Sequence, residues 1–226
     1  MVSTLSKSFN LERESHTFAD ELSGLLNGTI CDGVRLTSVV TAGRDRSRSV
    51  IGYRITKDNQ DLETCIPVTL GSDPTFHLGF SMRLERDHEN KFLMVRQSVM
   101  LLSPTADPSD ALLHYDYERD KRDGYPDAHL QICATSETWQ DVGQRLDGST
   151  RLLERMHLPV GGRRFRPTLE DIVEFLVTEH LVEARPSWRD AVDCGRESFR
   201  KKQLRAAIRR DPDTARDALA KIDADS

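Results

Sequence analysis

The chain has 226 residues, enough for one large domain or for one domain with a helical appendage. Hydrophobic residues make up 37% and charged residues 31% of the sequence, and apolar alternation in its middle excludes disorder throughout. The net charge of −5 argues against wholesale coating of nucleic acid or of an anionic membrane, but it permits a local basic face.

Four cysteines lie far apart in the sequence, and no two of them have the C-x-x-C spacing of a zinc or redox motif. They predict reduced thiols rather than a disulfide framework. The chain begins without the apolar core of a signal peptide, and no run approaches the roughly 20 apolar residues that span a bilayer. We therefore expect a cytoplasmic protein that makes no membrane contact. The cysteines are Cys31, Cys65, Cys133 and Cys194.

The first predicted element is a helix over residues 14–28, where apolar side chains recur at helical spacing and the pair Asn27–Gly28 marks the end. Three short segments rich in β-branched residues follow, and each of them predicts a strand. They cover residues 33–40, 49–56 and 62–70.

The clearest alternation covers residues 75–87, where every second side chain from Phe76 to Leu84 is apolar. This period of two predicts a strand with one buried and one polar face. Residues 91–102 return after a polar turn and complete a long antiparallel hairpin. On the returning strand we expect one face to hold Leu93, Val95, Val99 and Leu101.

Two further strands are predicted over residues 111–117 and 128–134, joined by a highly charged loop. Short connections between successive strands favour an antiparallel meander over a parallel α/β sheet.

The last third of the chain is predicted to be helical. A short helix in residues 146–156 is followed by a helix that Thr168 caps, a long helix over 188–210 and a last one over 213–222. The predicted class is α+β: an antiparallel meander with an N-terminal helix and a C-terminal helical segment. The expected units are an α+β domain over residues 1–183 and a C-terminal helical extension over residues 184–226.

The two strands around the charged loop carry the candidate catalytic residues. We expect Asp116 to face His129 across the antiparallel pair. His114 then faces Gln131, and the polar side chains share one face of the sheet. A carboxylate beside an imidazole fixes its tautomer and prepares it for general acid–base catalysis, so the candidates are His114, Asp116 and His129.

The alternative for these three residues is a cross-strand pair on a solvated face, with no chemistry attached. Their ligand types suit a metal ion, but their spacing matches no metal signature. We therefore expect no metal and no other cofactor.

Two basic segments are candidate binding sites. Arg163, Arg164 and Arg166 precede a predicted helix, where guanidinium groups and free backbone N–H groups can hold a phosphate. The alternative is an exposed basic loop. The second segment belongs to the long helix, where we expect only Glu197 to act as a counter-charge. Its basic residues contact nucleic acid or an acidic partner, and the alternative is a helix face exposed to solvent. Its candidate residues are Arg200, Lys201, Lys202, Arg205, Arg209 and Arg210.

After the strand hairpin, the chain continues with HYDY, a charged loop, YPDAHLQ and then LPVGGRRFRPTLEDIVEFL. This order of segments resembles the small TumE-type toxins of bacterial toxin–antitoxin systems. It also resembles neighbouring uncharacterised families that are linked to phage defence. The similarity covers about residues 75–180. Those families often continue the histidine strand with a second histidine, where this chain has Gln131. The resemblance implies functional roles for Tyr115, Asp116, Pro126 and His129.

Two functions are open at this point. The first is an intracellular interaction module of a toxin–antitoxin or antiphage defence system that binds nucleic acid or a partner protein of the same operon. The second is a metal-independent ribonuclease-like toxin or effector. In the second, Asp116 orients His129, either His129 or His114 transfers protons, and the arginines of the basic loop bind phosphate. A small-molecule sensor is a third possibility without specific support, and no oligomeric state is predicted.

Overall fold

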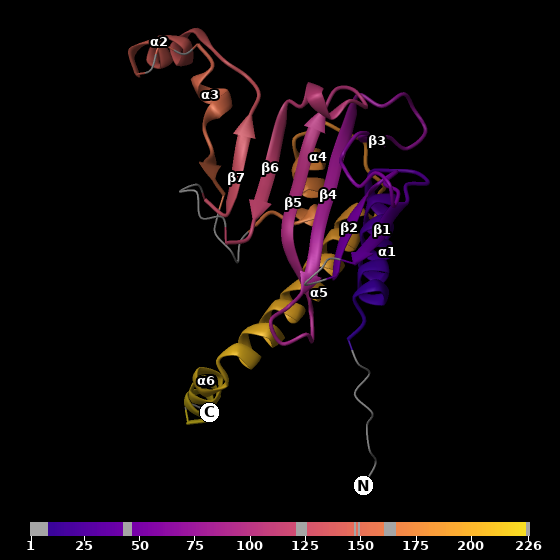
Figure 1. The fold of residues 1–226 in the computed structure, drawn as a ribbon, viewed down its shortest axis with the longest axis vertical. Coiled ribbons are helices and arrows are strands. Elements are labelled where there is room, and N and C mark those ends of the chain that lie inside the picture. Colours follow the sequence, from indigo (N-terminus) through magenta and orange to yellow (C-terminus); the bar gives the residue numbers. More distant parts are fainter. Residues whose placement is uncertain are drawn as a thin grey trace.

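The computed structural model describes residues 9–42, 47–120, 126–146, 148, 150–160 and 166–224. Its α+β class confirms the prediction: an eight-stranded antiparallel sheet follows an N-terminal helix in the chain and precedes C-terminal helices (Figure 1). The strands are β1 (Leu36–Ala42), β2 (Ser47–Tyr53), β3 (Ile66–Val68), β4 (Phe76–Arg86), β5 (Leu93–Ser103), β6 (Leu113–Glu118), β7 (Ala128–Ile132) and β8 (Leu158–Pro159). The helices are α1 (Leu11–Thr29), α2 (Glu137–Leu146), α3 (Leu152–Arg155), α4 (Leu169–Thr178), α5 (Trp188–Arg210) and α6 (Pro212–Ala224), with a 3-10 turn at Pro108–Asp110.

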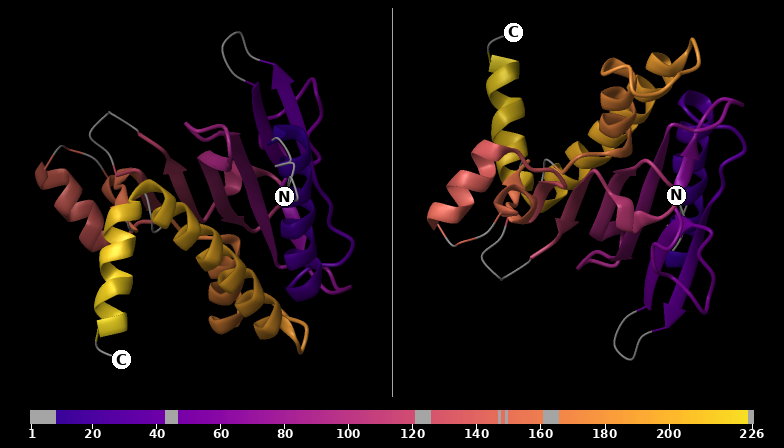
Figure 2. Two further views of the ribbon diagram at one scale, coloured as in Figure 1. Left: turned by 90° about the horizontal axis from the view of Figure 1, so that it is seen from below. Right: turned by 90° about the horizontal axis from the view of Figure 1, so that it is seen from above.

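The strand order is β1-β2-β4-β5-β6-β7-β8, and β3 pairs with the same edge of β4 as β2 does. Helices α1, α4 and α5 all cover one face of this sheet, as both views in Figure 2 show. We call this side the helix face and the other side the open face. Apolar side chains of the strands alternate onto the helix face and form one core with these three helices.

On the open face, a small apolar cluster forms where Ile55 folds back over Val39 and Val50. Helices α1, α4 and α5 leave this face uncovered, and α3 reaches it only where Gln131 of β7 donates to the Glu154 carbonyl. The side chains of His114 and Asp116 in β6 and of Gln131 in β7 are partly accessible, whereas His129 is buried.

The expectation that the four apolar side chains of β5 share one face is wrong, because a β-bulge interrupts the pairing of β5 with β4. Arg83 pairs with Gln97, but the next residue, Leu84, pairs with Val95, so one extra residue lies in β5. An extra residue moves every later side chain to the other face. Leu93 and Val95 therefore pack against the core on the helix face, while Val99 and Leu101 lie on the open face.

Helix α1 runs past the predicted stop and ends at Thr29. Instead of ending the helix, Asn27 holds the following loop: its side-chain amide donates to the Val34 carbonyl at 2.7 Å and accepts from the Val34 N–H at 2.8 Å. Two elements were not predicted, namely α2 and the two-residue strand β8. The cap of α4 is as predicted, because Thr168 and Asp171 form a reciprocal capping box.

The first half of α5 packs into the common core, where Val192 is fully buried. The division into units at residues 183 and 184 stays a prediction. Cys31, Cys65, Cys133 and Cys194 are free thiols, as expected. Among the helices of the described residues, none is both long enough and apolar enough to cross a bilayer.

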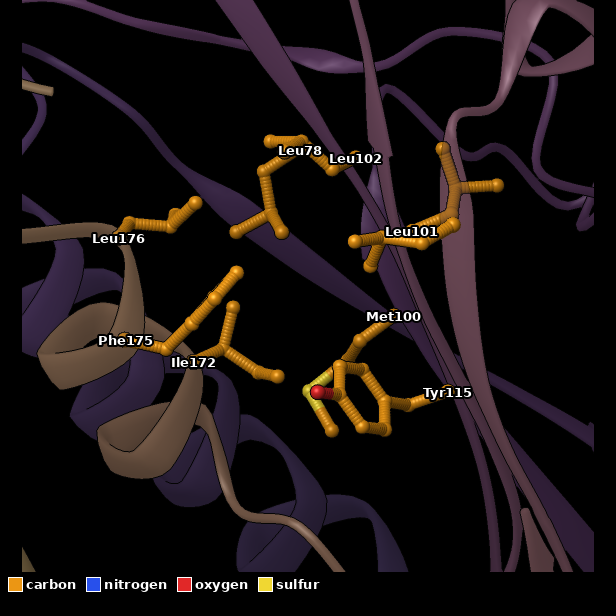
Figure 3. Close-up of a pocket in the computed structure, with 9 residues that line it drawn as sticks. Leu78, Met100, Leu101, Leu102, Tyr115, Ile172, Phe175 and Leu176 are labelled. Carbon is orange, nitrogen blue, oxygen red and sulfur yellow. The ribbon is translucent and has the colours of Figure 1, made fainter. Parts of the chain in front are cut away.

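Figure 3 shows a small gap between the sheet and α4. Met100 and Tyr115 border it from the strands, and Ile172 and Phe175 border it from the helix. Its volume is about 10 Å³, the space of one water molecule at most. This gap is a packing defect of the core, and burial there raises the pKa of the Tyr115 hydroxyl.

Gly79 provides the room that Leu101 needs on the open face, and this yields a stability prediction. A Cβ at Gly79 would lie 2.5 Å from Cγ of Leu101. We expect Gly79→Ala to lower the free energy of unfolding by about 1–3 kcal/mol through overpacking. The control is Gly24→Ala in α1, where a Cβ meets nothing within 4 Å. That change should stabilise the helix by about 0.5–1 kcal/mol. Urea denaturation measures the free energy of unfolding of both variants. Equal changes in the two variants would contradict the close contact between Gly79 and Leu101.

Candidate functional site

Strands β6 and β7 bring the predicted polar residues together in the predicted register. Asp116 pairs with His129 and His114 pairs with Gln131. The neighbours Tyr115 and Tyr117 alternate with them, and Tyr115 contacts the core of the helix face. His114, Asp116 and His129 therefore share the open face.

The carboxylate of Asp116 binds His114 more closely than His129, which differs from the expected arrangement. Nδ1 of His114 donates to Oδ2 of Asp116 at 3.0 Å, since a carboxylate can only accept. Nε2 of His129 lies 3.6 Å from the same oxygen. Nδ1 of His129 instead donates to the Pro126 carbonyl oxygen at 3.3 Å.

Burial separates the roles of the two histidines. His129 is only 2% exposed, whereas the side chains of His114 and Asp116 are 25% and 27% exposed. No hydrogen bond to a described residue occupies Nε2 of His114. His114 is therefore the side chain that can exchange a proton with a bound molecule, and His129 is a positioning residue behind it.

The second oxygen of Asp116 is buried and unsatisfied. Oδ1 has no hydrogen-bond partner among the residues that the structure describes. A buried acceptor without a donor is costly, and such groups often mark sites where a further molecule binds.

His157, which the sequence analysis missed, completes this cluster. Its ring meets the ring of His129 edge to face, with centroids 4.6 Å apart and planes at 65°. It directly precedes β8, whose Pro159 pairs with His129. A two-residue strand that contains proline shows no alternation, so the only sequence signal was a histidine beside a proline-containing segment.

The structure separates Arg166 from the histidine cluster. Its guanidinium carbon lies 5.5 Å from the centroid of Tyr117 and 6.0 Å from that of Phe199 in α5. Because Tyr117 points to the helix face and Asp116 to the open face, Arg166 lies on the opposite side of the sheet from Asp116. Arg166 therefore cannot contact a phosphate group held at Asp116 and His129, and its phosphate-binding role beside the helix stays a prediction. Arg163 and Arg164 lie outside the described residues.

The basic residues of α5 have more counter-charges than the one expected. Arg196 bonds to Asp171 at 2.9 Å and to Glu174, whose carboxyl pKa it lowers. Lys202 bonds to Glu21 of α1 at 3.0 Å. None of these residues contacts the histidine cluster. Of the other candidate residues, Arg200 and Lys201 pair with Glu197, Arg209 lies over the ring of Phe92, and Arg210 donates to the Ala206 carbonyl.

Cys133 follows β7 and is exposed. Partial desolvation and the charge of Glu154 raise its thiol pKa, which disfavours the thiolate needed for nucleophilic attack. Over the described ranges, no three His, Cys, Asp or Glu side chains are grouped in a way that could hold a metal ion.

Comparison of the chain with protein-family models, curated proteins and solved structures finds no match. The resemblance to the TumE-type toxins therefore stays a prediction.

The hydrogen bond from His114 to Asp116 fixes a tautomer, and this is directly measurable. Neutral His114 should carry its proton on Nδ1, because that nitrogen faces the carboxylate. A long-range proton–nitrogen NMR correlation distinguishes the two tautomers. In Asp116→Ala the preference should revert to that of exposed His88, which serves as the internal reference. An Nε2-protonated His114 in the unmodified protein would contradict the geometry.

Proposed function

We propose that the protein is an interaction module that binds a partner protein through its C-terminal arm, which we define as residues 200–224 of α5 and α6. The observation that carries this proposal is a group of large apolar side chains left in solvent. These are Leu204, Ile208, Leu219 and Ile222, with exposed fractions of 59%, 45%, 61% and 62%.

The spacing of these side chains places each pair on one side of its helix. Leu204 and Ile208 are four residues apart in α5, and Leu219 and Ile222 are three apart in α6. The two helices meet at Asp211 and diverge, while the last turns of α5 project beyond the sheet (Figures 1 and 2). Apolar residues at this spacing are typical of helices that dock against another protein.

The charges of the arm favour a protein partner with acidic residues beside an apolar stripe. Arg205 makes no ion pair with any residue in the described ranges, and Arg209 and Arg210 flank the exposed Ile208. Binding to a nucleic-acid backbone uses basic side chains but has no need of exposed leucine and isoleucine. The exposed apolar side chains therefore support a protein partner rather than nucleic acid.

The cellular setting belongs to the same proposal. The resemblance to toxin–antitoxin and antiphage families supports a cytoplasmic module whose partner is encoded in the same operon. The resemblance covers about residues 75–180, so the arm lies outside it and is a separate feature of this chain.

The arm is tested by site-specific crosslinking followed by affinity measurement. A photo-reactive residue at position 204 should capture a defined partner in source cells, whereas one at exposed position 73 should not. With that partner purified, Leu204→Asp/Ile208→Asp should weaken binding by at least about 100-fold, since two buried aliphatic contacts are lost. Leu146→Asp, which changes an exposed leucine of α2, should leave the affinity unchanged. Equal losses in both variants, or binding of RNA alone with steep salt dependence, would contradict the proposal.

A second candidate function has its own observation, the hydrogen bond between His114 and Asp116. We propose it as metal-independent RNA cleavage, in which Nε2 of His114 takes the proton of a 2′-hydroxyl as its oxygen attacks phosphorus. The bond from phosphorus to the 5′-oxygen breaks, the leaving oxygen takes a proton from water, and the products are a 2′,3′-cyclic phosphate and a 5′-hydroxyl. Asp116 holds the ring, and His129 packs behind the carboxylate. Arg166 takes no part, because it lies across the sheet.

The cleavage candidate is tested with labelled RNA in the presence of a chelator. His114→Gln should slow cleavage by at least about 100-fold while RNA affinity stays constant. His88→Gln changes an exposed histidine and should retain full activity. If the unmodified protein leaves RNA intact, or if His114→Gln cleaves at the same rate, the candidate is rejected.

A further inference from the structure

We propose that a phosphate-like oxyanion binds beside Arg166 on the helix face of the sheet, between Tyr117 of β6 and Phe199 of α5. This site is independent of the C-terminal arm and lies across the sheet from the histidine cluster.

Two buried donors in this place lack acceptors. Nη1 of Arg166 is buried without a hydrogen-bond partner, and so is the hydroxyl of the fully buried Tyr117. Arg166 makes no ion pair within the described part of the chain, and its guanidinium group lies over the rings of Tyr117 and Phe199. Buried charges are normally paired, because an unpaired one forfeits its hydration without compensation. The missing partner must therefore accept hydrogen bonds and carry negative charge.

A second cation strengthens the case for an anion. The guanidinium carbon of Arg119 lies 5.9 Å from the centroid of Tyr117, the same ring that Arg166 contacts. Burial first, and then the charge of Arg119, lower the pKa of Arg166. Two guanidinium groups around one phenol repel each other, and an anion near both relieves this repulsion.

The nearby carboxylates do not fill this role. Asp171 is engaged by the Thr168 cap and by Arg196. The carboxylate of Glu170 packs against Gly195 of α5. A Cβ added at Gly195 would lie 2.5 Å from Oε1 of Glu170. Both carboxylates act on Arg166 only through space, without a hydrogen bond to it. The N-terminus of α4 is likewise closed by its own capping box, so the site does not depend on the helix end.

The donor set defines the chemical class of the ligand. Guanidinium and phenol donate and do not accept in this arrangement, which suits a small tetrahedral oxyanion. Free phosphate and the terminal phosphoryl group of a nucleotide share this chemistry. The experiment therefore includes both sources.

The test uses the full chain and inorganic phosphate, with sodium chloride at matched ionic strength as the reference. Binding is measured by calorimetry and by broadening of the phosphorus NMR signal, and the melting temperature is followed in parallel. We expect saturable phosphate binding that Arg166→Met weakens at least tenfold and Tyr117→Phe weakens severalfold. Arg83→Met, which removes an exposed arginine of β4, should bind phosphate like the unmodified protein. Adenosine monophosphate, titrated in the same way, identifies the source if it binds more tightly.

The variants also distinguish an anion site from a structural arginine. Without phosphate, Arg166→Met should melt no lower than the unmodified protein, because it removes an uncompensated buried charge. A large loss of stability, or failure to fold, would make Arg166 a structural cation and overturn the proposal. Tyr117→Phe is the conservative variant, and unchanged phosphate affinity in it would also overturn the site. The absence of saturable binding of phosphate and of the nucleotide would do the same.

Discussion

The strict alternation of side chains along β6 is the constraint on which the chemistry of this protein depends. Successive residues of a strand point to opposite faces, so Tyr115 and Tyr117 enter the helix face while His114 and Asp116 remain on the open face. Pairing with β7 then brings His129 to Asp116. A slip of one residue between the strands would move His129 to the other face and disperse the cluster.

The same alternation separates the charged groups of the two sheet faces, and the helical arm is a third place. The open face holds a carboxylate shared by two imidazoles, the helix face holds a buried guanidinium on aromatic rings, and the arm holds exposed apolar and basic residues together. Among the described residues, each place has a group that lacks a partner of its kind. Asp116 has a hydrogen-bond acceptor without a donor, Arg166 is a cation without an ion pair, and the arm exposes apolar side chains to solvent. Our proposals assign a different partner to each.

Much of this arrangement could be predicted from local patterns. Period-two alternation located the long hairpin and the β6–β7 pair, and the placement of Asp116 opposite His129 followed from a simple antiparallel register. The cap of α4 was equally visible, because Thr168 and Asp171 have the spacing of a capping box. These features depend on residues that are close in sequence.

The features that were missed depend on distant or irregular contacts. The bulge in β5 adds a single residue, which apolar side chains on both faces of that strand concealed. Glu21 neutralises Lys202 from 181 residues away, so the sequence of α5 alone overstated its free positive charge. Arg166 reaches the ring of Tyr117 across the fold, and a proline in a two-residue strand hid the position of His157.

The most direct test of this account is a nuclear Overhauser experiment on the β6–β7 pair. Glu118 donates its N–H to Asp127 and Cys133 donates to Leu112, both at 2.8 Å, which makes these hydrogen-bonded pairs of the ladder. The alternate pairs, Tyr115 with Leu130 and Tyr117 with Ala128, are then the ones with the closest α-carbons, about 4.5 Å apart. The account predicts strong Hα–Hα signals within these two pairs. Strong signals that instead join each tyrosine to a neighbour of its stated partner would show a shifted register, and the separation of Asp116 from Arg166 would be contradicted.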